Sequence, residues 1–378
     1  DMHELKLSGY GAACFSLRFS PDGSKLAGGY LDGGLRIFDV DSATQLYTVN
    51  LTPRSTREEI ASAGSDFEVS DVRLKSSRGS AMMNLRWLPT AGTSRQGVVA
   101  TVDTKGTIGL WEIPFNSFPK VLAEVPGEIE LNALTFSRDG AKMMVGGQER
   151  VVKVYDVHDV RASTAKPLQQ LGSSVAGHRM KVLSLCAFPN HPDLLVSGAM
   201  DRSVLVWDLR APRGAVAGLS GIELSGDALD ISKDGVTLLA GSHRSENPLQ
   251  FSDLRKLTKG GDSPTSSAKT EVMDPCQTYH WSGELVKSEE QSAAPVATCL
   301  LFSIAWDSEN RTIVAAGEKG NAARVFSRSS NGSEGNLRVV KTFEGKARAF
   351  YSAAISADGK TAAFGSSDGS VNICSATR

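Results

Sequence analysis

Short runs of alternating apolar and polar residues recur along the chain, and the same turn signal follows several of them. Four segments have the form Ser-x-Asp-Gly, at residues 20–23, 137–140, 232–235 and 356–359. Each follows a run such as FSLRF and precedes a second short run such as KLAGGY. Alternation with a period of two residues is typical of strands, and Asp-Gly supplies the positive-φ positions of a tight turn. The pattern therefore predicts a series of antiparallel hairpins.

A third short strand is expected after each hairpin, and it ends in an aromatic residue that an acid usually follows. The segments RIFD, GLWE, KVYD and LVWD show this ending, and seven related endings occur in the chain. Four of the six intervals between them fit one four-stranded unit of about 40 to 45 residues with small loops. The chain is therefore expected to contain about seven such units. The residues at the aromatic position are Phe38, Trp111, Tyr155, Trp207, Ser252, Phe326 and Cys374.

Two of the intervals are longer than one unit requires. They contain residues 52–80 and 258–275, which are rich in Ser, Thr, Gly, Pro and charged residues. Such a composition is typical of loops between regular elements. We therefore expect a single domain over residues 1–378, with insertions at 52–80 and 258–275.

The fourth repeat contains the most specific motif. Gly177-His178 is followed by Ser197, then by Asp201 in an expected turn, and then by Trp207 with an acid after it. In order and spacing this motif resembles the signature of the WD-repeat family. The resemblance implies an all-β fold, a closed β-propeller of about seven four-stranded blades. It also implies a buried structural network in which His178 hydrogen-bonds Asp201, while Ser197 and Trp207 bond the histidine.

The two ends of the chain complement each other in this fold. The last repeat contains three expected strands, in YSAAIS, TAAFGS and VNICS, and the N-terminal segment HELKLSGY has no repeat of its own. An unpaired strand edge in a sheet is prone to aggregation. We therefore expect the N-terminal strand to complete the last blade and to close the ring.

Composition and charge narrow the classes of function. Lys and Arg total 41 against 42 for Asp and Glu, so the chain lacks the broad positive field that attracts nucleic acid. No apolar run approaches the roughly 18 residues of a membrane span, and no signal peptide is recognisable. The five cysteines are far apart, which favours a reducing compartment. An intracellular, cytoplasmic location is expected, with cytoskeletal or ciliary association as an alternative.

No catalytic constellation emerges from the motifs. Residues 365–369 match G-x-S-x-G around Ser367, but they join two expected strands, whereas a nucleophile elbow joins a strand to a helix. The six histidines are scattered, and no phosphate-binding loop occurs. The inner ends of the first strands read as Ala, Leu, Ser and Val, without convergent carboxylates or histidines. We therefore expect no enzyme activity, no metal, no cofactor and no small-molecule substrate.

The surface is the remaining place for function. In WD-repeat propellers the turns between second and third strands open on the same face as the links between blades, and partners usually dock there. Arginine and aromatic residues are also common at interface hot spots. The candidate partner-binding residues on this face are Tyr10, Arg150, Arg179, Met200, Arg202, Arg244, Lys319 and Arg348.

The leading hypothesis is a non-catalytic scaffold for protein–protein interactions within a multiprotein complex. One alternative is an integral subunit of a cytoskeletal, ciliary or other large assembly that docks through its insertions. A nucleic-acid or phosphoinositide reader would instead need Arg150, Arg179, Arg202 and Arg244 to form one continuous basic stripe.

Overall fold

Antiparallel pairing of consecutive short strands produces seven sheets in the computed structural model of the chain. The structure describes residues 2–7, 11–50, 80–89, 97–114, 117–162, 165–173, 176–211, 214–255, 272–273, 277–286, 299–319, 322–328, 337–344 and 348–376. The predicted insertion at 52–80 lies outside the described residues except for its last residue, and most of that at 258–275 lies outside them too.

The sheets are numbered here as blades in chain order. Blade 1 contains β2 (Cys14–Phe19), β3 (Lys25–Tyr30), β4 (Gly34–Asp39) and β5 (Thr44–Asn50), and blade 2 contains β6 (Met82–Trp87), β7 (Gly97–Asp103), β8 (Ile108–Ile113) and β9 (Lys120–Val125). Blade 3 contains β10 (Leu131–Phe136), β11 (Lys142–Gly147), β12 (Val152–Asp156) and β13 (Gln169–Leu171), and blade 4 contains β14 (Val182–Ala187), β15 (Leu194–Ala199), β16 (Ser203–Asp208) and β17 (Ala217–Ser220). Blade 5 contains β18 (Leu229–Ile231), β19 (Thr237–Gly241), β20 (Leu249–Asp253) and β22 (Gln277–Tyr279), and blade 6 contains β23 (Leu300–Trp306), β24 (Thr312–Glu318), β25 (Ala322–Ser327) and β26 (Arg338–Glu344). Blade 7 contains β27 (Phe350–Ile355), β28 (Thr361–Ser366), β29 (Val371–Ala376) and the N-terminal strand β1 (Met2–Leu7).

The innermost strands of the blades form a closed ring. β2, β6, β10, β14, β18, β23 and β27 follow one another around the centre, each contacts the next, and β27 contacts β2. The predicted closed propeller of about seven four-stranded blades is therefore confirmed. Blade 4 carries a fifth strand, because β21 (Val272–Met273), from the region predicted as the second insertion, pairs in parallel with β17.

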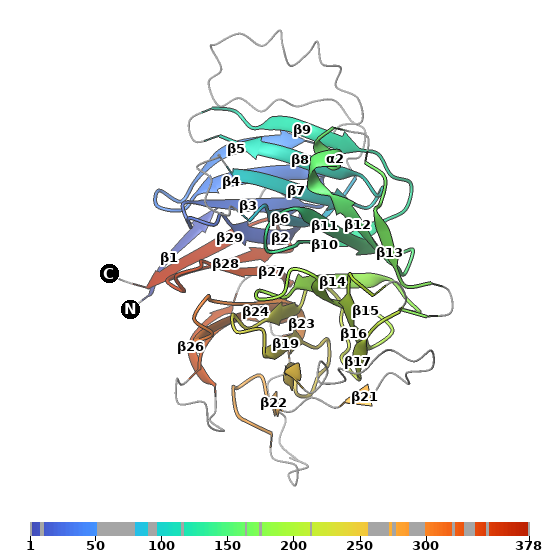
Figure 1. Cartoon of the computed structure of the whole chain (residues 1–378). Helices are drawn as coiled ribbons and strands as arrows, with labels where there is room; N and C mark the ends of the chain where they lie inside the picture. The colour runs from blue at the N-terminus through green and yellow to red at the C-terminus, as the bar shows by residue number, and fades with distance from the viewer. Residues whose placement is uncertain are drawn as a thin grey trace.

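The ring closes where the two ends of the sequence meet. β1 pairs antiparallel with β29, with Leu5 opposite Ile373 and Leu7 opposite Val371. Figure 1 shows the N- and C-termini side by side at this sheet. The prediction that the N-terminal strand completes the last blade is therefore confirmed.

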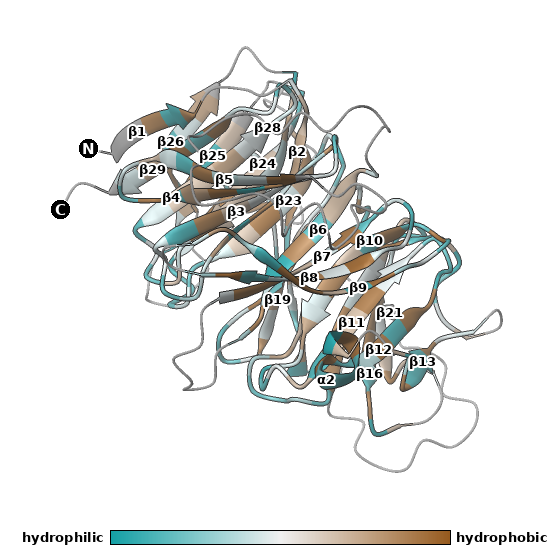
Figure 2. Cartoon of the chain, turned by 90° about the horizontal axis from the view of Figure 1, so that it is seen from above, coloured by the Kyte–Doolittle hydropathy of each residue, from teal (hydrophilic) through white to brown (hydrophobic). Residues whose placement is uncertain are grey.

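Neighbouring blades bury the core between them. Leu35 and Ile37 of blade 1 pack in one cluster with Met82, Leu85 and Val99 of blade 2, and all five are fully buried. In Figure 2 the hydrophobic colour is concentrated on the strands and the hydrophilic colour on the turns. Because each blade is covered on both faces only by its neighbours, the core depends on the complete ring.

The Ser-x-Asp-Gly segments form the turns between the first and second strands. In blade 1 the Ser20 hydroxyl donates to Asp22 Oδ1 at 2.5 Å and accepts from the Lys25 amide at 2.9 Å. Gly23 adopts a φ of 74°, which is the left-handed region that glycine tolerates best. The repeats at residues 137–140, 232–235 and 356–359 form the same bonds, which explains the recurrence of this motif.

A short helix follows the third strand of blade 3. α2 (Val157–Arg161) follows β12, and the Asp156 carboxylate caps it by accepting from the His158 amide at 2.7 Å. Val157 and Val160 face the core of blades 2 and 3. No helix among the described residues is long and apolar enough to cross a membrane.

Removing residues 1–7 is expected to lower the midpoint of thermal unfolding by about 5 °C or more and to promote aggregation, because β29 then presents an open edge. Differential scanning calorimetry and size-exclusion chromatography measure both effects. A synthetic peptide of residues 1–8 should restore part of the loss, and a peptide of scrambled order should not. An unchanged midpoint would show that closure does not depend on β1.

Candidate functional site

The turns between the second and third strands place cations on strained backbone. Arg150 of blade 3 has a φ of 67° and Arg202 of blade 4 has a φ of 65°. The same turn position is glycine in blades 1, 2 and 7, where Gly33, Gly106 and Gly369 have φ near 80°. A left-handed conformation costs a residue with a side chain about 1 kcal/mol relative to glycine. The chain thus keeps two arginines at positions where glycine is easier to accommodate.

The turn of blade 6 holds a third cation in left-handed backbone, since Lys319 has a φ of 63°. Its side chain and that of Arg202 line one depression of about 540 Å³ over blades 4 to 6, which we call the blade 4–6 depression. The other lining residues are Glu223, His243, Arg244, Ser245, Glu246, Asn247 and Leu300.

Two guanidinium groups converge on one carboxylate in this depression. Arg202 Nη2 lies 3.7 Å and Arg244 Nε lies 3.8 Å from Glu223 Oε2. Arg244 also donates through Nη2 to the Gly221 carbonyl oxygen. Three of the predicted partner-binding residues, Arg202, Arg244 and Lys319, are therefore brought together.

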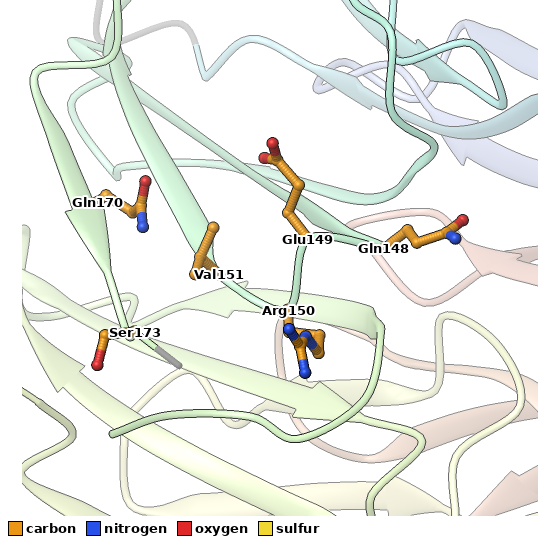
Figure 3. Close-up of a pocket in the computed structure, with 6 residues that line it drawn as sticks. All are labelled: Gln148, Glu149, Arg150, Val151, Gln170 and Ser173. Atoms are coloured by element: carbon orange, nitrogen blue, oxygen red, sulfur yellow. The ribbon is translucent and has the colours of Figure 1, made fainter. Parts of the chain in front are cut away.

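Arg150 belongs to a separate depression of about 360 Å³. Figure 3 shows Arg150 and Glu149 extending in different directions from the turn after β11, with Gln170 and Ser173 on the adjoining segment. Glu149 forms an ion pair with Lys153 across the turn. Since Arg150 does not line the blade 4–6 depression, the four arginines considered for a basic stripe in the sequence analysis do not share one depression.

Of the remaining predicted contact residues, Met200 lies in the same turn as Arg202, and Arg179 and Arg348 lie on links between blades. Arg179 and Met200 are exposed, and the Arg179 amide donates to Asp201 Oδ2 at 2.6 Å. Arg348 is exposed, and its amide donates to the Ser367 hydroxyl at 3.1 Å. Tyr10 lies outside the described residues. We call the surface formed by Arg150, Arg179, Met200, Arg202, Arg244, Lys319 and Arg348 the turn face.

The motif of the fourth repeat forms a buried relay of hydrogen bonds. The indole N–H of Trp207 donates to Ser197 Oγ at 2.7 Å, and Ser197 Oγ lies 2.6 Å from His178 Nε2. On the other side of the ring, His178 Nδ1 lies 2.9 Å from Ser203 Oγ and 3.4 Å from Asp201 Oδ2. The resemblance implied that Trp207 bonds the histidine, but Trp207 bonds Ser197 instead. Ser203 is a further member of the relay that the sequence did not reveal.

The directions of these bonds indicate the tautomer of the histidine. The Ser203 hydroxyl donates to Asp201 Oδ1 at 2.5 Å, so its oxygen accepts the proton of His178 Nδ1. His178 Nε2 then accepts from the Ser197 hydroxyl, whose oxygen accepts from the Trp207 indole. A neutral histidine protonated on Nδ1 satisfies every donor in the relay.

Asp201 is held as a carboxylate at the surface end of this relay. Burial favours the neutral acid, but hydrogen bonds from His178, Ser203 and the Arg179 amide outweigh it and hold the Asp201 pKa far below its usual value. The relay thereby fixes the link around Arg179 to the turn that contains Met200 and Arg202.

A second charged cluster joins the innermost strands across the centre of the ring. Asp227 accepts hydrogen bonds from Arg18 on β2, from Arg86 on β6 at 2.7 Å and from Ser184 on β14 at 2.8 Å. Burial would raise the Asp227 pKa, but Arg86 and Arg18 lower it below its usual value. Asp230 accepts from the Trp306 amide at 2.8 Å, and burial raises its pKa. The expectation that the inner strand ends carry only Ala, Leu, Ser and Val is therefore wrong.

This central cluster has the chemistry of a structural tie. Its two carboxylates face two guanidiniums, and each Asp227 oxygen already accepts a hydrogen bond. Within the described ranges no group of three His, Cys, Asp or Glu side chains is suited to hold a metal ion. Burial raises the pKa of Cys14 to about 11 and that of Cys299 to about 12, so neither thiol is an activated nucleophile.

Ser367 of the G-x-S-x-G match sits in the turn between β28 and β29. Its amide donates to the Ala349 carbonyl at 2.9 Å, and its hydroxyl accepts from the Arg348 amide. Turn geometry explains its place in the sequence.

Comparison with known proteins agrees with the architecture. The sequence profile of the family "WD domain, G-beta repeat" matches residues 3–39 and 168–208, the second of which contains the His178 relay. This chain is a WD-repeat protein. THO complex subunit 3 of Arabidopsis thaliana is 27% identical over 130 residues, which are 34% of this chain and 38% of that protein.

Two further relatives share parts of this WD-repeat protein. The ribosome biogenesis protein WDR12 homolog of Culex quinquefasciatus is 26% identical over 195 residues, 50% of this chain and 44% of the relative. The GATOR2 complex protein Wdr59 of Drosophila melanogaster is 33% identical over 107 residues, 28% of this chain and 10% of the relative. The matched regions thus span less than half of each of these relatives.

Replacing Asp201 with Asn is expected to lower the free energy of unfolding by about 1 to 3 kcal/mol at pH 7, because the relay loses its charged acceptor. The depressed pKa stabilises the fold above about pH 4, the ordinary range of an aspartate, and this contribution is lost as the pH falls further. Urea unfolding between pH 7 and pH 3 should therefore show the difference between parent and variant narrowing in acid. Asp41→Asn, at an exposed site, is the control, and a gap that widens in acid would contradict the assignment.

Asp227→Ala leaves two largely buried guanidiniums without their carboxylate and should cost about 3 to 5 kcal/mol of stability. The triple variant Arg18→Met, Arg86→Met, Asp227→Leu should recover much of this loss, because it removes all three charges together. Chemical denaturation of both variants gives the comparison. A triple variant no more stable than Asp227→Ala would show that the cluster is not a simple charge tie.

Proposed function

We propose that this WD-repeat protein is a non-catalytic scaffold that binds partner proteins on its turn face. The observation that carries the proposal is the pair of arginines, Arg150 and Arg202, at turn positions where three other blades have glycine. Strain of this kind concentrates at functional sites, where the side chain offsets its cost through binding. Arginine is also the cation most enriched at interface hot spots.

The names of the relatives support a role in assemblies. One relative is a subunit of the THO complex and another is a protein of the GATOR2 complex. Both share stretches of sequence with this chain, and we transfer a role in an assembly to it as a proposal. Multiprotein complexes are therefore the proposed setting.

Proteins fit the turn face better than nucleic acids do. Acidic residues alternate with its cations, since Glu149 is next to Arg150, and Glu223 and Glu246 line the blade 4–6 depression. A phosphate backbone needs a continuous basic path, whereas a protein surface can match alternating charges. The net charge of −1 supports the same choice.

We further propose one domain over residues 1–378, because β1 and β29 join both ends of the chain in one sheet. We propose a cytoplasmic setting, since Cys14 and Cys186 are free thiols. The alternative of docking through the insertions at 52–80 and 258–275 concerns segments that lie largely outside the described residues.

Affinity purification from the native cell, followed by mass spectrometry, tests the scaffold role. The triple variant Arg150→Glu, Arg202→Glu, Arg244→Glu should lose most of the partners that the parent chain retains, because its turn face becomes acidic. Circular dichroism and the unfolding midpoint check that the variant is folded.

A matched control reverses three charges at the opposite end of the blades. Arg138, Lys233 and Lys360 lie in Ser-x-Asp-Gly turns and are exposed, so their change to Glu should leave the partners in place. Loss of the same partners from both variants, or from neither, would contradict docking on the turn face.

A further inference from the structure

We infer that the blade 4–6 depression binds an acidic side chain of a partner protein, presented by an extended peptide segment. The inference rests on the proposed function and names the chemistry that one part of the turn face recognises. The depression is built by three consecutive blades, because its cations come from the turn of blade 4, the turn of blade 5 and the turn of blade 6. These cations are Arg202, Arg244 and Lys319.

Two of the three cations are held in place at a conformational cost. Arg202 and Lys319 both occupy left-handed backbone, and both are exposed at the rim of the depression. Such a conformation fixes the direction in which the side chain leaves the turn. A solvated charge needs no such fixed direction, whereas a binding group does.

The guanidinium groups have capacity for another acceptor. Both Arg202 and Arg244 are 3.7 to 3.8 Å from Glu223, beyond the 2.7 to 3.2 Å or so of a good hydrogen bond. Among the described residues, no acceptor is within hydrogen-bond distance of the Arg202 side chain. Glu223 thus shows which chemical group the site attracts while leaving room for a better-placed carboxylate.

The wall of the depression has unused hydrogen-bonding atoms. His243 packs on Phe302 at 4.9 Å between ring centres, and its Nε2 lies 3.6 Å from Glu318. His243 Nδ1 and Asn247 Oδ1 have no hydrogen-bond partner in the described part of the chain. A peptide backbone supplies both N–H donors and carbonyl acceptors, so an extended segment can complete this wall after a small shift of the turn.

A carboxylate suits this site better than a chain of phosphates. The three cations alternate with Glu223, Glu246 and the nearby Glu318, so the net charge of the site is small. One acidic side chain competes only with Glu223 for Arg202 and Arg244, whereas a polyanion would meet Glu223, Glu246 and Glu318 together. Binding of a nucleic acid at this site would therefore contradict the inference.

The test is a selection of random dodecapeptides, displayed on phage, against the full chain. Asp or Glu should be enriched at one position of the selected peptides. The affinity of a selected peptide, measured by fluorescence anisotropy, should fall by about tenfold in the variant Arg202→Gly, Lys319→Gly. Glycine suits the backbone at both positions, so the unfolding midpoint of this variant should equal or exceed that of the parent.

Two further variants sharpen the result. Glu223→Gln removes the internal competitor and should tighten binding several-fold, an effect that a purely structural role would not produce. The control Arg138→Gly, Asn310→Gly removes one cation and one left-handed side chain from the opposite end of the blades, and it should leave binding unchanged.

The inference is overturned if selected peptides lack acidic residues, if they bind the Arg202→Gly, Lys319→Gly variant as well as the parent, or if a single-stranded oligonucleotide displaces them. If the charge-reversal variant loses its cellular partners but the selected peptides show no enrichment of Asp or Glu, the scaffold role stands and the inferred chemistry of the depression is rejected. If the selected peptides are enriched in Asp or Glu but charge reversal leaves the cellular partners in place, docking on the turn face is rejected and the acidic-peptide site stands.

Discussion

The fold depends on ring closure, because no blade can cover its own faces. Each four-stranded sheet has apolar side chains on both sides, and only the two neighbouring blades can remove them from water. The pairing of β1 with β29 makes the seventh blade complete and covers the edge of β29. The same pairing explains why a chain of 378 residues can form one continuous ring of sheets.

The turns at the two ends of the blades differ in regularity. At one end, Ser-x-Asp-Gly turns repeat with the same bonds, as Ser20 and Asp22 show, and they form the hairpins. At the other end the turns differ from blade to blade and include the strained Arg150 and Arg202. Regular turns define the scaffold, and the irregular turns are free to carry recognition. The His178 relay links the scaffold to the irregular turns. Its inner part, His178 and Ser197, is buried, and at its outer end Asp201 holds the turn that contains Arg202.

The buried charges at the centre follow from the same geometry. In a ring of inner strands, side chains far apart in sequence meet within a few ångströms, and Asp227 can reach two arginines from blades 1 and 2. An unpaired charge there would be costly, so acids and arginines occur in equal number. The cluster thus ties distant parts of the ring together through hydrogen bonds to both oxygens of Asp227.

The sequence by itself determined the hairpins, the number of blades, the closing strand and four of the five relay residues, because these depend on local alternation, turn chemistry and a spaced motif. It could not reveal Ser203 in the relay, since many serines follow an aspartate in a turn. It also could not reveal that Arg18 and Arg86 share Asp227, or that Arg202, Arg244 and Lys319 line one depression while Arg150 lies apart. Those groupings depend on the angular position of each blade in the closed ring. Only the tertiary structure fixes that position, because it results from packing between sheets and not from any local pattern.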